Sequence, residues 1–181
     1  MHWVPQDVLW EMGASFVDAT PQTASAVIES AIHRAATLVD ATAIGIWALD
    51  PVSMSGRVVH RWSSSAWVDL GDDFLASPDP SVRDEVLAGG GMAIVTLARA
   101  VGQEICDERG WHDGYALIAL IEQQPNESTV LVVASGDNSW DEADLELIRG
   151  TVMLLRQFHS RLTRKHIVIC PAIRLFHIGL D

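Results

Sequence analysis

VLVVASGDNSWDEADLELIRGTVMLL, residues 130–155, decides the fold of this chain. Its first residues are apolar and rich in valine, which is typical of a buried strand. A short polar turn follows. Asp141 then stands where a helix N-cap is expected, and Glu142 and Asp144 place negative charge in the first helical turn. The stretch therefore predicts a buried strand that runs through a tight turn into a long, capped helix.

The predicted C-terminal helix carries two apolar stripes. One follows the a/d steps of a heptad repeat and consists of Leu145, Ile148, Val152, Leu155, His159 and Leu162. The second stripe lies off that seam and consists of Leu147, Leu154 and Phe158. We expect one stripe to pack on the chain's own sheet and the other on a partner helix, with the seam as the interface of a homodimer. The alternative is one wide stripe that is buried in a single core.

Upstream of this stretch, the spacing of apolar residues switches between the period of a helix and that of a strand. Helices are expected over residues 6–17, 22–39 and 81–88, and strands over 43–49, 57–64, 92–97, 115–122 and 128–135. Residues 65–80 are expected to form a loop, and 98–110 a loop or short helix. This order predicts an α+β fold on a central antiparallel sheet of five or six strands.

Composition narrows the class of protein. The chain has 181 residues, 49% hydrophobic and 20% charged, which fits one globular domain. Its net charge of −12 disfavours nucleic acid as a partner. No spanning segment or signal peptide is seen, so we expect a soluble, cytoplasmic protein without a membrane partner. Cys106 and Cys170 have no spacing typical of a disulfide framework or a zinc site.

Two stretches together resemble a known family. Residues 22–39 run through Leu38-Val39-Asp40-Ala41 into the strand AIGIWAL (43–49), and residues 130–155 close the domain with a strand, a polar turn and an acidic-capped helix. These patterns resemble a GAF domain, a small-molecule-sensing relative of the PAS fold. In particular they are similar to the GAF domains that precede GGDEF and EAL modules in actinobacterial cyclic-di-GMP enzymes, including the tryptophan in VVHRWSS (58–64).

The resemblance covers residues 20–162, with an N-terminal helix in 1–19 and an atypical tail in 163–181. It implies N- and C-terminal helices on one face of the sheet and a ligand-pocket side on the other, closed by the loops around 65–90 and 98–114. It also implies dimerisation through the terminal helices and a last helix that continues into an output domain or signals to an output protein. The NKFDE pattern of cyclic-nucleotide-binding members is absent, so cAMP and cGMP are not favoured.

Aromatic and polar residues that border the implied pocket are candidates for binding an unidentified small molecule. They are Trp62, Trp111, Tyr115, Arg61, His112 and Cys106. The alternative for the tryptophans is that Trp47 and Trp62 fill the core of the sheet.

The sequence predicts no cofactor and no metal, and bilin and haem are the alternatives left open. Cys106 lies in the region where bilin-binding GAF domains carry their attachment cysteine, but Asp107 follows it instead of histidine. A free, partly buried thiol is the favoured interpretation. A lone His60 or His112 is a conceivable haem ligand, yet neither has a second ligand at metal-binding spacing.

The tail from residue 163 differs in composition, since it holds the chain's only lysine, Lys165, and four isoleucines. One hypothesis is that the chain is truncated or out of frame where an output module begins. The other is an edge strand over 167–178, although Pro171 opposes a helix there.

No catalytic motif is found. The sequence therefore predicts a non-catalytic domain, and the resemblance implies a sensory or regulatory domain that dimerises and binds a small molecule, in cyclic-di-GMP signalling. The alternative is a structural dimerisation module whose pocket is filled by its own tryptophans and binds no ligand.

Overall fold

The computed structural model describes residues 4–64, 78–111, 114–136 and 140–169, the last seven by their backbone alone. In chain order the elements are α1 (Pro5–Asp18), α2 (Ala24–Leu38), β1 (Ala43–Leu49), β2 (Gly56–Ser63), α3 (Pro80–Ala88), β3 (Met92–Thr96), α4 (Leu97–Val101), α5 (Gln103–Arg109), β4 (Tyr115–Gln123), β5 (Ser128–Ser135) and α6 (Glu142–Ile169). The five strands form one antiparallel sheet in the order β2-β1-β5-β4-β3. The predicted α+β class is confirmed.

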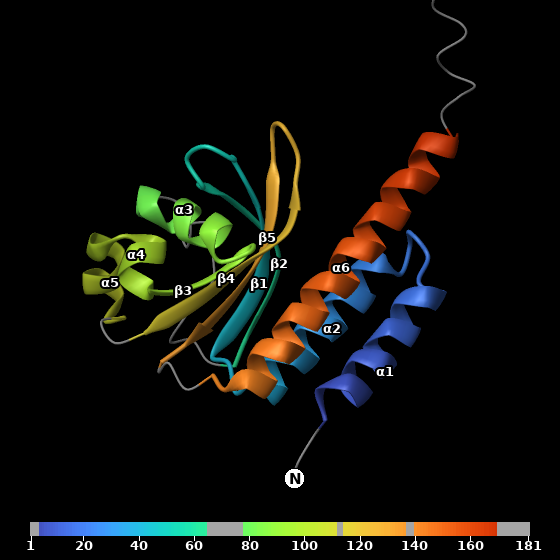
Figure 1. The fold of residues 1–181 in the computed structure, drawn as a ribbon, viewed down its shortest axis with the longest axis horizontal. Helices are drawn as coiled ribbons and strands as arrows, with labels where there is room; N and C mark the ends of the chain where they lie inside the picture. Colours follow the sequence, from blue (N-terminus) through green and yellow to red (C-terminus); the bar gives the residue numbers. More distant parts are fainter. Residues whose placement is uncertain (1–3, 65–77, 112–113, 137–139, 170–181) are drawn as a thin grey trace, which may run out of the picture.

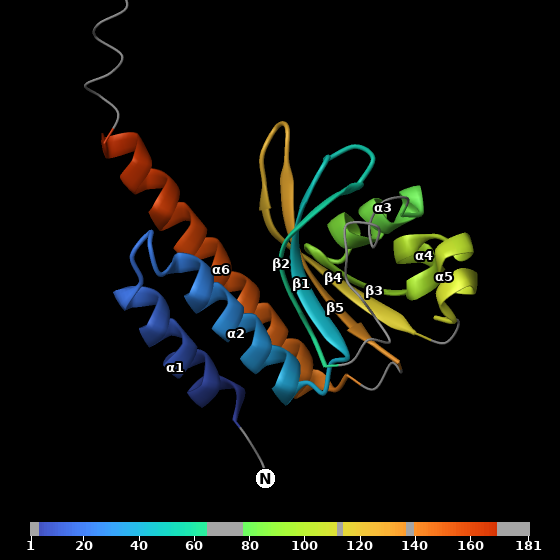
Figure 2. The ribbon, with the colours of Figure 1, turned by 180° about the vertical axis from the view of Figure 1, so that it is seen from behind.

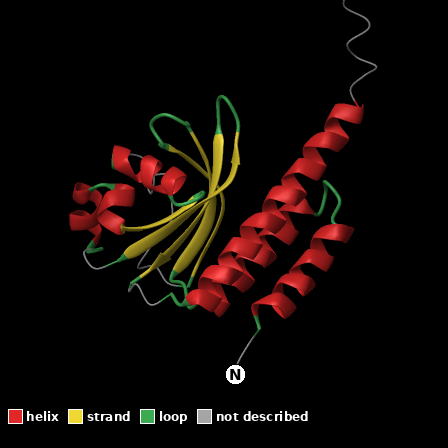
Figure 3. Cartoon of the chain, in the orientation of Figure 1, coloured by secondary structure: helices red, strands yellow, loops and turns green. Residues whose placement is uncertain are grey.

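The sheet separates two helical layers (Figures 1–3). Helices α1, α2 and α6 cover one side, here called the helix face. The short helices α3, α4 and α5 lie on the other side, the distal face. The expectation for residues 98–110 resolves into α4 and α5, which meet at Gly102 with φ 96°. These layers contain the described residues only.

Strand β1 is buried along all seven residues because both layers cover it. Ile44 and Ile46 enter the core on the helix face, whereas Trp47 and Leu49 enter the core on the distal face. A strand that is covered on both sides carries apolar residues without alternation. The edge strand β2, which pairs only with β1, instead alternates between half-buried and exposed residues.

The start of α6 is capped as the sequence predicts. The Asp144 backbone N–H donates to Asp141 Oδ1 at 3.0 Å, and the Asp141 N–H donates to Asp144 Oδ2 at 3.0 Å. These reciprocal bonds satisfy N–H groups that have no partner within the helix. The helix begins where the acidic pattern places it.

The predicted dimer seam is buried inside this chain. Ile148, Val152 and Leu155 belong to the core on the helix face, and Leu145 and Leu162 pack against it. His159 contacts Glu122 of β4. The prediction that Ile148, Val152 and Leu155 form a homodimer interface is therefore wrong, because α6 turns these side chains towards the core of its own chain. For the partly exposed Leu145, His159 and Leu162 it stays a prediction.

The second stripe of α6 is covered by α1. The rings of Phe16 and Phe158 lie 4.9 Å apart, and Leu9 packs so close to Gly150 that a Cβ there would lie 2.2 Å from Leu9 Cδ1. Arg161 donates to the carbonyl oxygens of Phe16, Val17 and Ala19, at 2.5, 2.9 and 3.1 Å. The partner helix that the two stripes require is thus α1 of the same chain.

Helix α6 continues to Ile169, seven residues beyond the predicted domain boundary. The first three residues of the hypothesised edge strand, 167–169, are helical, which contradicts that hypothesis for them. Residues 170–181 lie outside the described part of the chain. Among the described helices, none combines the length and apolar character needed to cross a membrane.

Candidate functional site

The structure does not bring the predicted ligand-binding residues together. Cys106 and Trp111 are buried in the distal core. Trp62 packs against the core on the opposite, helix face. Arg61, its neighbour on β2, points the other way because successive strand residues alternate. His112 lies outside the described residues.

Tyr115 begins β4 and shares the face of Leu117, which belongs to the core on the helix face. The ring of Trp62 stacks on His33 of α2, with centroids 4.9 Å apart and an interplanar angle of 27°. Trp47, by contrast, is fully buried on the distal face. Trp47 therefore fills a core, as the alternative for it predicts, whereas Trp62 is partly buried and packs against the core on the other face.

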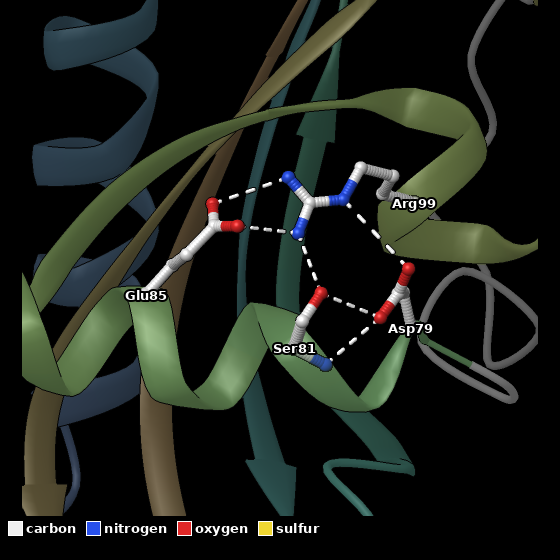
Figure 4. Close-up of polar contacts among 4 residues, drawn as sticks. All are labelled: Asp79, Ser81, Glu85 and Arg99. Carbon is white, nitrogen blue, oxygen red and sulfur yellow. Dashed lines mark hydrogen bonds and ion pairs between the residues drawn. The ribbon is translucent and has the colours of Figure 1, made fainter.

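On the distal face, Arg99 of α4 connects to α3 through two carboxylates (Figure 4). Its Nη2 and Nη1 donate to Glu85 at 2.6 and 3.2 Å, and Nη2 also donates to Ser81 Oγ at 2.7 Å. Its Nε lies 3.8 Å from Asp79 Oδ2. Asp79 in turn caps α3, since Ser81 donates to Asp79 Oδ1 from its backbone N–H at 2.8 Å and its hydroxyl at 2.6 Å.

This cluster links two helices and leaves little of the Arg99 guanidinium for a ligand. Hydrogen bonds from Ser81 hold the pKa of Asp79 below its ordinary value, and the Glu85 carboxylate raises the pKa of Arg99. Bidentate pairing to a carboxylate is the strong geometry for arginine. The sequence reveals the Asp79 cap, but the Arg99–Glu85 pair requires the tertiary arrangement.

Acid is expected to remove the contribution of the Asp79 carboxylate to the stability of the fold. A carboxyl group whose pKa is lowered by folding stabilises the protein above its unfolded pKa, and this contribution is lost as pH falls through the lowered, folded value. Asp79→Ala should therefore destabilise the domain at pH 7, and the difference from the parent should shrink below about pH 4. Urea unfolding of both proteins at pH 7 and pH 3 measures this difference in the free energy of unfolding. A difference that stays constant on acidification would contradict the assignment.

A groove of about 230 Å³ lies on the helix face, between the sheet and α6. Its walls are mostly aliphatic or aromatic, including Ile28, Ile46, Val59, Ile121, Leu155 and Phe158. Arg57, His60, Glu127 and His159 add the polar part of the lining. The sequence gives no local signal for this groove, because its walls come from α2, α6 and all strands except β3.

Within the described residues, no group of three or more histidine, cysteine or acidic side chains has the arrangement of a metal site. This observation concerns metal-holding geometry only.

Comparison with solved structures identifies the fold. The phycoerythrobilin-bound GAF domain from a cyanobacterial phytochrome is similar with a TM-score of 0.67 at 17% identity, over 92% of this chain and 99% of that one. The PixJ GAF domain of Thermosynechococcus elongatus, in its blue-light absorbing form, gives 0.56 at 15%, over 96% and 97%. A GAF domain/HD domain protein from Geobacter sulfurreducens gives 0.54 at 13%, over 77% and 93%. The chain has the GAF fold.

At the level of sequence, neither a protein-family model nor a curated protein matches the chain. The fold likeness is therefore structural, at identities that carry no information on ligands.

The surroundings of Cys106 do not fit a covalently attached bilin. The thiol is fully buried beside Trp111 and Val101, and this burial, with a smaller effect from Asp107, raises its pKa. The thiolate is the nucleophilic form of cysteine, and an apolar core disfavours it.

Cys106 should be unreactive in the folded protein. Iodoacetamide at pH 8 is expected to label it at least about tenfold more slowly than in 6 M guanidinium, because alkylation needs an exposed thiolate. Peptide mapping by mass spectrometry separates Cys106 from Cys170 in the same sample. Equal labelling rates with and without denaturant would show that the thiol is accessible and would reopen the question of covalent attachment.

Proposed function

We propose that this chain is a sensory or regulatory domain that passes its state to an output module or partner protein through α6. The GAF fold supports this proposal by likeness, since a phycoerythrobilin-bound phytochrome domain and a blue-light absorbing domain share it. Fold does not determine function, so the proposal rests mainly on how α6 is attached to the rest of the molecule.

The observation that carries the proposal is the set of contacts between α6 and the backbone of other elements. Arg156 donates from Nε to the Ile121 carbonyl at 2.7 Å and from Nη2 to the Leu120 carbonyl at 3.0 Å. His159 contacts Glu122 one residue further along β4. Arg161 binds the C-terminal end of α1 in the same manner. A displacement of β4 or α1 therefore acts directly on α6, whose last turns run on beyond α1 (Figure 1).

Hydrogen exchange measured by mass spectrometry tests this role. Molecules that bind are first selected from a metabolite library by thermal shift. A bound molecule is then expected to change the amide exchange of α6 after Arg156 in the parent, and much less in Arg156→Leu, which lacks the link to β4. The control is Arg149→Leu, because Arg149 is an exposed residue of α6 that pairs with Glu142 on the same helix. A ligand that binds without any effect on α6 would contradict the proposal.

The output is proposed to be a cyclic-di-GMP enzyme. The resemblance of residues 22–49 and 130–155 to GAF domains that precede GGDEF and EAL modules supports this choice. Sequencing the neighbouring DNA tests it. An in-frame or adjacent GGDEF or EAL reading frame is the expected result, and a neighbourhood without either module would count against this output.

Dimerisation is retained as a proposal with a different interface. Trp10 and Val17 are the most exposed apolar side chains of α1, at 82% and 69%, and Met153 of α6 is 57% exposed. Trp10→Asp with Met153→Asp is expected to halve the mass measured by light scattering. The control is Val52→Asp, because Val52 lies in the β1–β2 turn and is 79% exposed, about as much as Trp10. An unchanged mass in the double variant would exclude this interface.

One observation favours the ligand-free alternative. Trp47 and Trp111 fill the distal core, the side on which the family resemblance places the pocket. A protein that binds nothing in the library screen, yet forms the dimer, would support a structural dimerisation module.

A further inference from the structure

The groove on the helix face lies where two neighbouring strand pairs are irregular at the same level of the sheet. Between β1 and β2, Ile46 pairs with His60 and Trp47 with Val58, so Val59 is an extra residue. Between β4 and β5, Leu120 pairs with Val130 and Glu122 with Thr129, so Ile121 is an extra residue. Bulges of this kind bend the strand, increase its twist and redirect side chains.

The two bulges create the groove. The extra residues Val59 and Ile121 both line it, as does His60 next to Val59. Beyond this level the β1–β2 and β4–β5 hairpins curve away from α6 (Figures 1 and 2). The Ile121 carbonyl, released from regular pairing, accepts the bond from Arg156. The opening is therefore built by the sheet and secured by α6, which distinguishes it from incidental loose packing.

The electrostatics of the groove favour an uncharged ligand. Each basic group at its rim already faces a carboxylate: Arg57 lies 4.0 Å from Glu127, His60 lies 3.5 Å from Glu29, and His159 contacts Glu122. Among the described residues of the rim, each basic group thus has a carboxylate beside it, which disfavours an anionic ligand. The apolar walls favour a molecule that buries hydrocarbon surface.

The volume and His60 narrow the ligand class further. A cavity of about 150 Å³ accommodates benzene, so 230 Å³ suits a molecule of roughly bicyclic size. The His60 side chain is only 14% exposed, and Glu29 lies beside its Nδ1. A carboxylate there favours the proton on Nδ1, which leaves Nε2 as a hydrogen-bond acceptor.

We propose that this groove is a binding site for a small, neutral, mainly apolar molecule that carries one hydrogen-bond donor, which His60 accepts. Leu155, Phe158 and Leu162 form the α6 side of the groove, so an occupant touches α6 and the bulged strands at once. The inference deepens the proposed function by naming a ligand class and a site, and binding itself does not depend on signal transmission.

Indole and benzofuran form a matched pair of probes, since they share a shape and only indole has an N–H donor. Methyl NMR spectra of the full chain should show saturable indole shifts at Val59, Leu155 and Leu162. Methyls of the distal core, such as Val95 and Val101, should not move. Benzofuran should bind at least about fivefold more weakly, and His60→Leu should remove this difference. Shifts confined to the distal core would overturn the site. Equal affinity for both probes would overturn the assignment of the hydrogen-bond donor.

Filling the groove provides the second arm of the test. Val59→Trp, from the half-exposed bulge, should weaken indole binding at least about tenfold, and Val52→Trp in the adjacent turn should leave it unchanged. Leu162→Trp fills the same groove from α6 and does not depend on how β2 tolerates the larger side chain. Undiminished binding in both filling variants would overturn the proposal, as would nuclear Overhauser contacts from residues 170–181 to the groove methyls in the free protein.

The two proposals fail separately. Indole binding without a change in α6 exchange would leave the site intact and count against transmission. An absence of indole binding would remove the site, while transmission from another ligand would still be testable in Arg156→Leu.

Discussion

Val152→Asp combined with Leu155→Asp unfolds the domain instead of dissociating a dimer. Val152 and Leu155 are 7% and 3% exposed in the single chain. Removing a buried aliphatic side chain costs about 2–4 kcal/mol, and a buried, unpaired carboxylate costs several more. Since a domain of this size is stable by about 5–15 kcal/mol, the double substitution exceeds or exhausts that stability.

Far-UV circular dichroism and thermal melting check this outcome, with light scattering on the same samples. Gln157→Asp is the matched control, because Gln157 lies two residues after Leu155 on α6 and is exposed. It should retain the parent's helix content and melt within a few degrees of it. A double variant that stays folded, with a parent-like melting temperature and half the parent's mass, would restore the seam as a dimer interface.

The sequence predicts α6 well because its signals are local. The preceding strand, the Asp141–Asp144 cap and the heptad steps all lie within residues 128–162. Both stripes are covered within the chain, and their buried side chains belong to one core, as the alternative of a single wide stripe predicts. What local signals cannot specify is which helix covers which stripe. Helix α1 has an apolar stripe of its own, yet only the folded chain shows that it packs against α6.

The ligand-binding residues are harder to predict because β1 is apolar on both faces, so its pattern does not identify which face adjoins the long helices. The bulge at Val59 then places consecutive residues, Val59 and His60, on the helix face, against strict alternation. As a result Trp62 faces α2, while Cys106 and Trp111 lie across the sheet. The groove itself follows from paired irregularities that no hydrophobic period encodes.

Trp47→Ala should be the most damaging single truncation on the distal face. The indole is fully buried and lies against Gly45, where a Cβ would be 2.6 Å from the Trp47 ring. Replacing a buried tryptophan by alanine removes its transfer free energy and leaves a cavity, at a cost of about 3–5 kcal/mol. The contact with Gly45 and the interior position of β1 in the sheet restrict collapse around that cavity, which favours the upper part of this range.

Guanidinium unfolding measures the loss, with Val52→Ala as the control. Val52 is 79% exposed, so its truncation should change the free energy of unfolding by less than about 0.5 kcal/mol. The comparison also distinguishes two interpretations of the distal face, a core that its own tryptophan fills and a pocket that binds a ligand. A large loss means that the tryptophan fills the core there, which favours the helix-face groove as the ligand site. A loss below about 1 kcal/mol would mean that the ring is dispensable to packing, and would favour a distal pocket that a ligand occupies in its place.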